Sequence, residues 1–276
     1  MTSEFTGPKT ACVVGGTGFV ASLLIKQLLL KGYAVNTTVR DPENEKKIPH
    51  LKALQELGEL KIFAADLTNE GSFDAPVVGC DIVFHVATPV NFASEDPEND
   101  MIKPAIKGAL NVLKACAKAK SVKRVIMTSS AAAVSINTLS GTGLVMDEKC
   151  WSDVEFLTRN EFLINAIKGM QLLSGSFSIT HVEDVCRAHI FVAEKETASG
   201  RYICAAVNTS VPEVAEFLSK RYPQYKIPTD FGDFPTKAKV ALSSEKLISE
   251  GFSFKYGIEE TYDQTVEYLK TKGVLK

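Results

Sequence analysis

The sequence predicts an α/β protein with a doubly wound parallel sheet, followed by a smaller C-terminal lobe. Three observations support this fold class. Apolar runs of strand length alternate with helix-length segments, a glycine-rich turn joins the first run to the first helix, and the C-terminal part is built on a smaller scale. Strands separated by helices in this rhythm form parallel sheets that are covered on both faces.

The predicted elements follow one another in a regular order. Strands are predicted for the apolar or β-branched runs at 10–14, 34–39, 60–66, 81–87 and 124–130. Helices are predicted for 22–30, which stops at Lys31 and Gly32, for 45–57, which ends at Gly58, and for 101–119. Further along, 177–196 predicts a strand and then a helix, and 211–222 and 262–273 predict two more helices. The crossovers between parallel strands should be right-handed.

Composition and charge narrow the class of protein. The chain has 276 residues, 45% hydrophobic and 23% charged, which is enough to bury a large core in one or two domains. A net charge of −2 with interleaved signs disfavours a nucleic-acid surface, so we expect a small-molecule partner. No apolar run reaches the roughly 18 residues of a membrane span, and the N-terminus lacks a signal-peptide core, so we expect a soluble, cytoplasmic protein. Six scattered cysteines indicate neither a zinc site nor a disulfide framework.

The glycine turn is the first chemical signal. Gly15, Gly18 and Ala21 have the spacing Gly-x-x-Gly-x-x-Ala between a strand and a helix. One glycine permits a sharp turn, another lets the backbone approach a pyrophosphate, and the small residue allows close packing of helix and strand. The N–H groups that open the helix then face the phosphates. The turn therefore predicts a dinucleotide site of the Rossmann type, with a turn made only for packing as the alternative.

The end of the second strand predicts which nucleotide binds. Arg40 ends this strand, and its planar guanidinium suits a 2′-phosphate, with Lys46 and Lys47 adding charge. We therefore predict NADP(H). In the alternative interpretation, Arg40 only pairs with the adjacent Asp41, or Asp41 binds the ribose. The end of the third strand is expected to lie at the edge of the adenine. The end of the fourth strand has residues small enough to approach the cofactor closely. The predicted cofactor-binding residues are Gly15, Thr17, Gly18, Phe19, Val20, Arg40, Lys47, Asp66, Leu67, Val86, Ala87, Thr88 and Ser129.

Longer stretches of sequence carry a family resemblance on both sides of residue 158. They include ACVVGGTGFVASLL, NTTVRDP, FHVATPV, VKRVIMTSSAAAV and ITHVEDVCRAHIFVAEKE. The chain resembles the plant flavonoid branch of the extended short-chain dehydrogenase/reductase family, and most of all its anthocyanidin-reducing members. This resemblance implies an NADPH-dependent reductase of flavonoid biosynthesis that converts anthocyanidins to flavan-3-ols. Dihydroflavonol 4-reductases share FHVATP and DPEN, and they remain an alternative.

The same resemblance implies a catalytic triad of serine, tyrosine and lysine. Ser130 would orient the reacting oxygen, with Ser129 as a weaker candidate; alternatively, the Ser130 hydroxyl only caps a backbone group. Tyrosine and lysine should lie four residues apart on one helix face, so that the ammonium stabilises the phenolate. They are not found at the expected place, because no tyrosine lies between Tyr33 and Tyr202. Several tens of residues are therefore predicted to be missing after Thr158.

A missing block would have structural and functional consequences. The sheet would lose an inner strand and one covering helix, which would expose the edge of the fifth strand and an apolar face. This leaves open a catalytically impaired NADP(H)-binding isoform, whereas a protein that retains the block would carry the complete triad. Two other matches to Tyr-x-x-x-Lys, at 222–226 and 268–272, are interpreted as a chance match broken by Pro223 and as a surface helix.

These arguments predict two domains. The NADP(H)-binding domain is expected at 8–158 with about 177–206, and a partly missing substrate lobe at 159–176 with 207–276. The sequence does not predict an oligomeric state.

Overall fold

The computed structural model describes residues 9–91, 94–135, 143–152, 176–231 and 240–275. The chain forms two compact units. The first unit comprises residues 1–128 and 185–198, and the second comprises 129–184 and 199–276. The structure gives no separate test of the predicted functional domains, and the predicted boundary at residue 158 lies outside the described residues. Those domains therefore stay a prediction.

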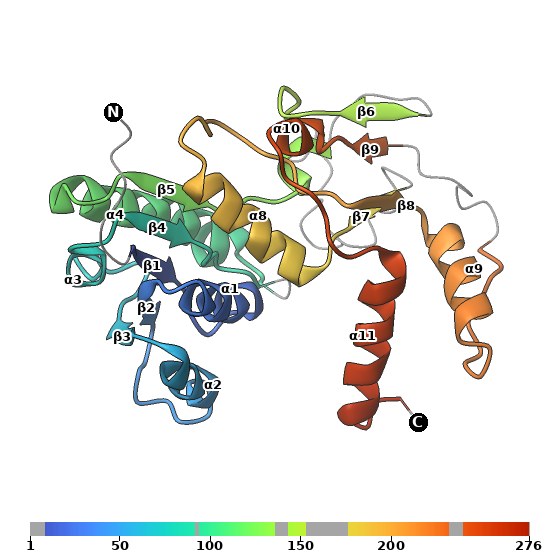
Figure 1. Cartoon of the computed structure of the whole chain (residues 1–276), viewed down its shortest axis with the longest axis horizontal. Helices are drawn as coiled ribbons and strands as arrows, with labels where there is room; N and C mark the ends of the chain where they lie inside the picture. Colours follow the sequence, from blue (N-terminus) through green and yellow to red (C-terminus); the bar gives the residue numbers. More distant parts are fainter. Residues whose placement is uncertain (1–8, 92–93, 136–142, 153–175, 232–239, 276) are drawn as a thin grey trace. The chain divides into compact units, whose positions relative to one another are not determined.

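The first unit is built on a five-stranded parallel sheet with the strand order β3-β2-β1-β4-β5 (Figure 1). Its strands are β1 (Thr10–Val14), β2 (Ala34–Val39), β3 (Leu60–Ala64), β4 (Ile82–His85) and β5 (Arg124–Met127). β1 lies between β2 and β4, with Val14 level with Thr38 on one side and His85 on the other. This order confirms the predicted Rossmann-type sheet, in which the strand order reverses beside β1.

The helices of this unit follow the sequence prediction except at three points: the first begins at residue 19 and not 22, the second begins later than predicted, and the short helix Asp74–Val77 was not predicted. They are α1 (Phe19–Leu30), α2 (Pro49–Leu54) with a 3₁₀ turn at Gln55–Leu57, α3 (Asp74–Val77), α4 (Lys103–Ala119), which follows a π turn at Glu98–Ile102, and most of α8 (Val182–Glu194). The prediction that a helix begins at residue 45 is wrong. The N–H groups of Lys47 and Ile48 both donate to the carbonyl of Asn44 and close a turn, so the helix begins only at Pro49. Proline is well suited to a first helical position.

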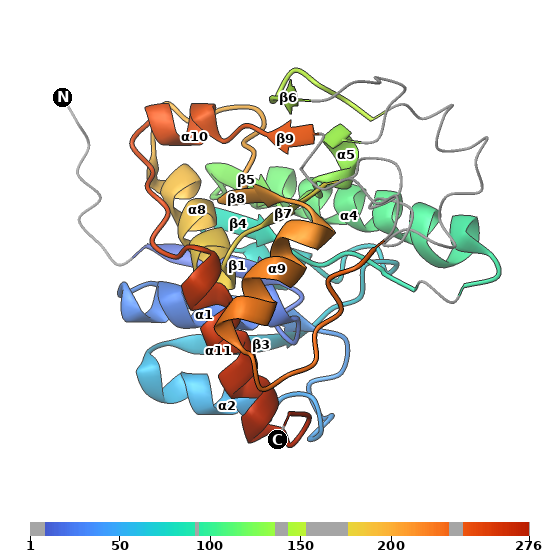
Figure 2. The same ribbon diagram turned by 90° about the vertical axis from the view of Figure 1, so that its right-hand side faces the viewer.

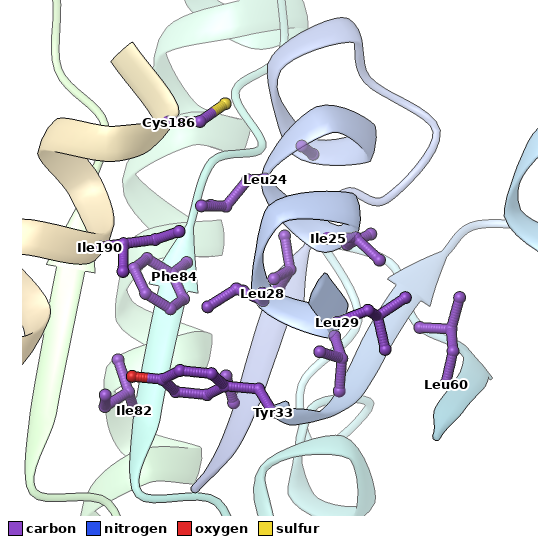
Figure 3. Close-up of a cluster of buried hydrophobic side chains, with 14 of the residues drawn as sticks. Leu24, Ile25, Leu28, Leu29, Tyr33, Leu60, Ile82, Phe84, Cys186 and Ile190 are labelled. Atoms are coloured by element: carbon purple, nitrogen blue, oxygen red, sulfur yellow. The ribbon is translucent and has the colours of Figure 1, made fainter. Parts of the chain in front are cut away.

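Two apolar layers cover the two faces of the sheet. On one face, Leu24 and Leu28 of α1 pack with Phe84 of β4 and Ile190 of α8 (Figure 3). On the other face, Val83 packs with side chains of α3 and α4. Neighbouring residues of β4 therefore point to opposite faces, as a strand covered on both sides requires. Burying each large apolar side chain contributes about 1.5–3 kcal/mol, which makes this sheet a rigid base for the loops at its edge.

Polar contacts attach the end of α8 to the first unit. The guanidinium of Arg124, on β5, donates to the carbonyl oxygens of Val192 (2.7 Å) and Glu196 (2.9 Å). The Tyr33 hydroxyl donates to the carboxylate of Glu194 at 2.8 Å. A cation at the carboxyl end of a helix satisfies carbonyls that lack intrahelical partners. These contacts explain why 185–198 belongs with residues that precede it by more than fifty positions.

An apolar stripe lies along α4 and the turn before it, and the last residue of β5 is also exposed. Among the described residues β5 is the terminal strand, and the Met127 side chain is 48% exposed. Four aliphatic residues spaced along one face of α4 and the turn before it are between 42% and 57% exposed: Ile102, Ile106, Leu110 and Leu113. These side chains are exposed, while the exposure predicted for the β5 edge itself stays a prediction. Contiguous exposed apolar surface of this kind favours association.

We expect charged substitutions in this stripe to reduce self-association. The double variant Ile106→Lys, Leu110→Lys should stay monomeric to higher concentration, while its free energy of unfolding changes by about 0.5 kcal/mol or less, because both side chains are exposed. Sedimentation velocity over a concentration series measures the first effect and urea unfolding the second. Leu30→Lys, an exposed leucine at the end of α1, is the matched control and should change neither. Unchanged self-association in the double variant would contradict the prediction.

The second unit contains two small sheets and four helices in its described residues. β6 (Leu144–Met146) pairs parallel with β9 (Val240–Leu242), and β7 (Phe177–Ile179) pairs antiparallel with β8 (Val207–Thr209). The helices are α5 (Ala132–Ser135), α9 (Val211–Arg221), α10 (Glu245–Ser249) and α11 (Ile258–Thr271). α9 and α11 lie side by side (Figure 2), and Arg221 donates to Asp263 between them. The predicted strand and helices of 177–196, 211–222 and 262–273 are confirmed, although α11 begins four residues earlier.

The helices of the described ranges are too short or too polar to cross a membrane, because none of them combines the length and the apolar character that a bilayer span requires.

Candidate nucleotide-binding site

The glycine turn after β1 is held by the backbone and side chain of Thr38. The N–H of Gly15 donates to the Thr38 hydroxyl at 3.2 Å, and the N–H of Gly16 donates to the Thr38 carbonyl at 2.9 Å. Gly15 has φ = +88°, a conformation that favours glycine. Thr38 was not among the predicted site residues. A hydroxyl residue two positions before Arg40, in the strand beside the turn, is the sequence signal that points to it.

The space around the turn leaves no room for a side chain at two positions. A Cβ atom on Gly15 would lie 2.7 Å from the Cβ of Ala87, and one on Gly16 would lie 2.2 Å from the hydroxyl oxygen of Thr37. That hydroxyl is fixed, because it donates to the carbonyl of Val13 at 2.8 Å in a buried strand. The structure thus brings Gly15 and Ala87, from two predicted parts of the site, into contact. The tight packing keeps the turn low against the sheet, where a phosphate can approach its backbone.

The first turn of α1 presents backbone donors without competing side chains. Gly18 is the N-cap residue, no side chain caps the helix, and its first turn contains no acidic residue. The side chain of Phe19 is 77% exposed, while Val20 is half-buried against the core. The N–H groups of such a helix start carry a partial positive charge. This arrangement favours an anion at the start of α1.

A cavity of about 340 Å³ opens beside the turn, where β2 ends. Two cations in its wall are the predicted Arg40 and Lys47. The Asp41 carboxylate in the same wall accepts the N–H of Glu43 at 2.9 Å, and within the described part of the chain it forms no ion pair with Arg40. The lining residues are Thr17, Val39, Arg40, Asp41, Asn44 and Lys47. The cavity therefore joins the glycine turn to two positive charges, as a phosphorylated ribose requires.

Asp66 and Leu67, after β3, are tied into the unit by different contacts. The hydroxyl and the N–H of Thr68 donate to the Asp66 carboxylate and lower its pKa, and the nearby guanidinium of Arg40 lowers it further. Asp66 therefore lies in the electrostatic field of Arg40. The carbonyl of Leu67 accepts from Asn111 of α4 at 2.9 Å. These contacts fix the loop that we expect at the adenine.

The remaining predicted residues follow β4 and β5. Val86 is half-buried beside the core, and Thr88 is exposed. Ser129 and Ser130 are exposed and belong to the second unit. The Ser130 hydroxyl accepts the N–H of Ala132 at 3.1 Å, at the start of α5. It therefore makes the backbone contact that the sequence left as an alternative, and its catalytic role stays a prediction.

A buried histidine fixes the end of β5, just before these serines. Nδ1 of His189 donates to the carbonyl of Val185 at 2.7 Å, so Nε2 accepts the hydroxyl proton of Thr128 at 2.8 Å. The N–H of Thr128 donates to the carbonyl of His85. Burial lowers the pKa of both His85 and His189. Both imidazoles are consequently neutral at pH 7.

We expect acid to destabilise the first unit through these histidines. An unfolded histidine takes up its proton near pH 6.5, whereas the folded His85 and His189 resist protonation. The histidines' contribution to the free energy of unfolding should be fully present above about pH 6.5. Below that pH, the free energy of unfolding should fall by up to roughly 1.4 kcal/mol per pH unit for each imidazole. Urea unfolding at pH 7.5, 6.5 and 5.5 measures this slope. His189→Gln should reduce it and His50→Gln, at an exposed position on α2, should not; equal slopes in all three proteins would refute the assignment.

The sheet order, the glycine turn and the cation-lined cavity define a nucleotide-binding protein of the Rossmann class. The family model of the 3-beta hydroxysteroid dehydrogenase/isomerase family matches residues 12–158. The chain belongs to this family of oxidoreductases, in the branch of the anthocyanidin reductases.

Individual relatives support this placement. An anthocyanidin reductase of Vitis vinifera, described as (2S)-flavan-3-ol-forming, is 64% identical over 98% of both chains. A dihydroflavonol 4-reductase of Dianthus caryophyllus is 38% identical over 97% of this chain and 89% of the relative. The crystal structure of vestitone reductase from alfalfa has a TM-score of 0.78 and 33% identity, covering 96% of this chain and 99% of that one. The identities favour the anthocyanidin reductases over the dihydroflavonol 4-reductases.

The comparison also bears on the missing block. The alignment to the grapevine relative extends over 330 positions, whereas the chain has 276 residues, so at least 54 positions have no counterpart in it. Because 98% of each chain is covered, these positions are internal. Their predicted place after Thr158 lies outside the described residues.

Proposed function

We propose that the protein binds NADPH and reduces anthocyanidins to flavan-3-ols in the plant cytosol. The observation that carries this proposal is the cavity at the end of β2, which combines Arg40 and Lys47 with the glycine turn in a chain that is 64% identical to an anthocyanidin reductase. The same cavity supports NADPH over NADH, because a 2′-phosphate needs cations and a free 2′-hydroxyl does not.

The residues of the site fit this cofactor. The two glycines that have no room for a Cβ atom let the backbone approach a pyrophosphate, and the uncapped start of α1 offers it N–H donors. Arg40 and Lys47 would hold the 2′-phosphate, and Asp66 and Leu67 would edge the adenine. When bound, the cofactor supplies the hydride. Ser130 would orient the reacting oxygen of a planar polyphenol.

A second candidate function follows from the internal gap. At least 54 positions of the grapevine relative have no counterpart here, and no tyrosine lies between Tyr33 and Tyr202 to donate a proton. Loss of a general acid costs about 10²- to 10⁴-fold in rate. A protein that binds NADP(H) without turning it over is therefore the alternative.

One experiment separates the two functions. Purified protein, with its intact mass verified, is titrated with NADPH and NADH and then assayed for NADPH oxidation with cyanidin and with dihydroquercetin. Turnover with cyanidin supports the reductase, and turnover with dihydroquercetin alone would assign the dihydroflavonol reaction. Tight NADPH binding without turnover supports the second candidate. Absence of binding by either nucleotide would contradict both.

In a chain that shows turnover, we expect Ser130→Ala to lose at least about 100-fold in kcat, with an unchanged Kd for NADPH. The hydroxyl would act on the reacting oxygen and not on the nucleotide. Stopped-assay product analysis and NADPH fluorescence titration measure the two quantities. Ser135→Ala, which removes a hydroxyl bonded only to the carbonyl of Ala131 in the described residues, is the control. Full activity of Ser130→Ala would contradict a catalytic role for Ser130 and leave its hydroxyl only the contact with the N–H of Ala132.

A further inference from the structure

Asn44 makes most of the hydrogen bonds that hold the turn between β2 and α2. Its N–H donates to the carbonyl of Asp41, and its own carbonyl accepts the N–H groups of Lys47 (2.9 Å) and Ile48 (3.2 Å). The side-chain oxygen Oδ1 accepts the N–H of Lys46 at 3.2 Å. Asn44 thus determines the path of the chain from the end of β2 to Lys47.

The far end of this turn is anchored in the core. Ile48 is 1% exposed and packs in the apolar layer that contains α1. Lys47, one residue earlier, is exposed and lines the cavity. A long, flexible lysine contributes most to anion binding when its backbone is held in place, because less conformational entropy is then lost on binding. The Asn44 turn provides this anchoring.

The side-chain amide of Asn44 has a donor to spare. Asn44 lines the cavity together with Arg40 and Lys47 and is half-buried. Its Oδ1 is used by Lys46, while its Nδ2 donates no hydrogen bond to any residue in the described ranges. An amide nitrogen carries two donors, and phosphate oxygens are strong acceptors.

We propose that Asn44 is a specificity-determining residue for the 2′-phosphate of the cofactor, donating from Nδ2 and holding the turn that places Lys47. This inference rests on the proposed NADPH binding and names a recognition residue within that site. A neutral donor selects for phosphate without the strong desolvation of a third cation, and it opposes the repulsion from the nearby Asp41 carboxylate.

The test is direct nucleotide binding, measured by nicotinamide fluorescence with NADPH and NADH. Asn44→Ala should raise the Kd for NADPH about tenfold and leave the Kd for NADH within about twofold. Asn44→Asp keeps the acceptor for Lys46 but removes the donor, and it should weaken NADPH binding at least as much as Asn44→Ala does. Competition by adenosine 2′,5′-bisphosphate against adenosine 5′-monophosphate should show the same difference without the nicotinamide.

Glu45→Gln is the matched control, because Glu45 is exposed in the same turn and does not line the cavity. If Glu45→Gln strengthens NADPH binding as much as Asn44→Asp weakens it, the net charge of the turn and not the amide sets the affinity, and the inference is overturned. Equal losses for NADPH and NADH in Asn44→Ala, or no loss, would also overturn it. If the unaltered protein binds neither nucleotide, the proposed function itself fails. If the unaltered protein binds NADPH but the Asn44 variants do not behave as expected, only the inference about Asn44 fails.

Discussion

Gly16→Ala will destabilise the first unit and weaken nucleotide binding more than tenfold. The new Cβ atom would lie 2.2 Å from the Thr37 hydroxyl oxygen, which is bonded to the carbonyl of Val13 inside the sheet and cannot rotate away freely. Relief of the clash must lift the turn from β2, at a cost of about 1–3 kcal/mol of unfolding free energy. Urea unfolding and titration with NADPH measure the two effects.

A double variant tests whether this contact is the cause. Thr37→Ala removes the hydroxyl and the methyl group that the new Cβ atom would meet, so Gly16→Ala with Thr37→Ala should be less destabilised than the sum of the single variants. Gly58→Ala is the control, because its Cβ atom would have its nearest neighbour at an ordinary 3.4 Å. Strictly additive effects of Gly16→Ala and Thr37→Ala would show that the clash is not responsible.

Arg40→Asp will reverse the preference between the two nucleotides. The variant replaces a cation in the cavity wall by an anion next to Asp41, so a 2′-phosphate loses a charge-assisted hydrogen bond and meets repulsion. We expect the Kd for NADPH to rise about 100-fold, equivalent to about 2.7 kcal/mol, while the Kd for NADH stays within a few-fold. Fluorescence titrations at fixed ionic strength measure both constants.

The control for Arg40→Asp is Lys46→Asp, which changes the charge by the same amount in the same segment but outside the cavity lining. It should weaken NADPH binding only a few-fold, because exposed charges are screened by salt. An equal effect of the two variants would remove Arg40 from the site and favour a general electrostatic contribution of this loop.

Local sequence patterns were sufficient for most of the first unit. Three strands were predicted from periodicity and composition alone: the β-branched run 34–39 and the apolar runs 10–14 and 82–85. The glycine spacing likewise located the turn. The start of α2 was mispredicted because a side chain and a carbonyl of one asparagine, Asn44, outweigh the helix propensity of the residues after it.

The amino-acid sequence alone thus established the fold class, the family resemblance, the cationic character of the β2 end and the lack of a tyrosine between Tyr33 and Tyr202. The folded structure was needed to establish which residues of different strands meet: Thr37 and Thr38 of the neighbouring strand contact the glycine turn, and Ala87 contacts Gly15. The reason is that a strand pairing brings together residues more than twenty positions apart, and no pattern within a short window contains that contact.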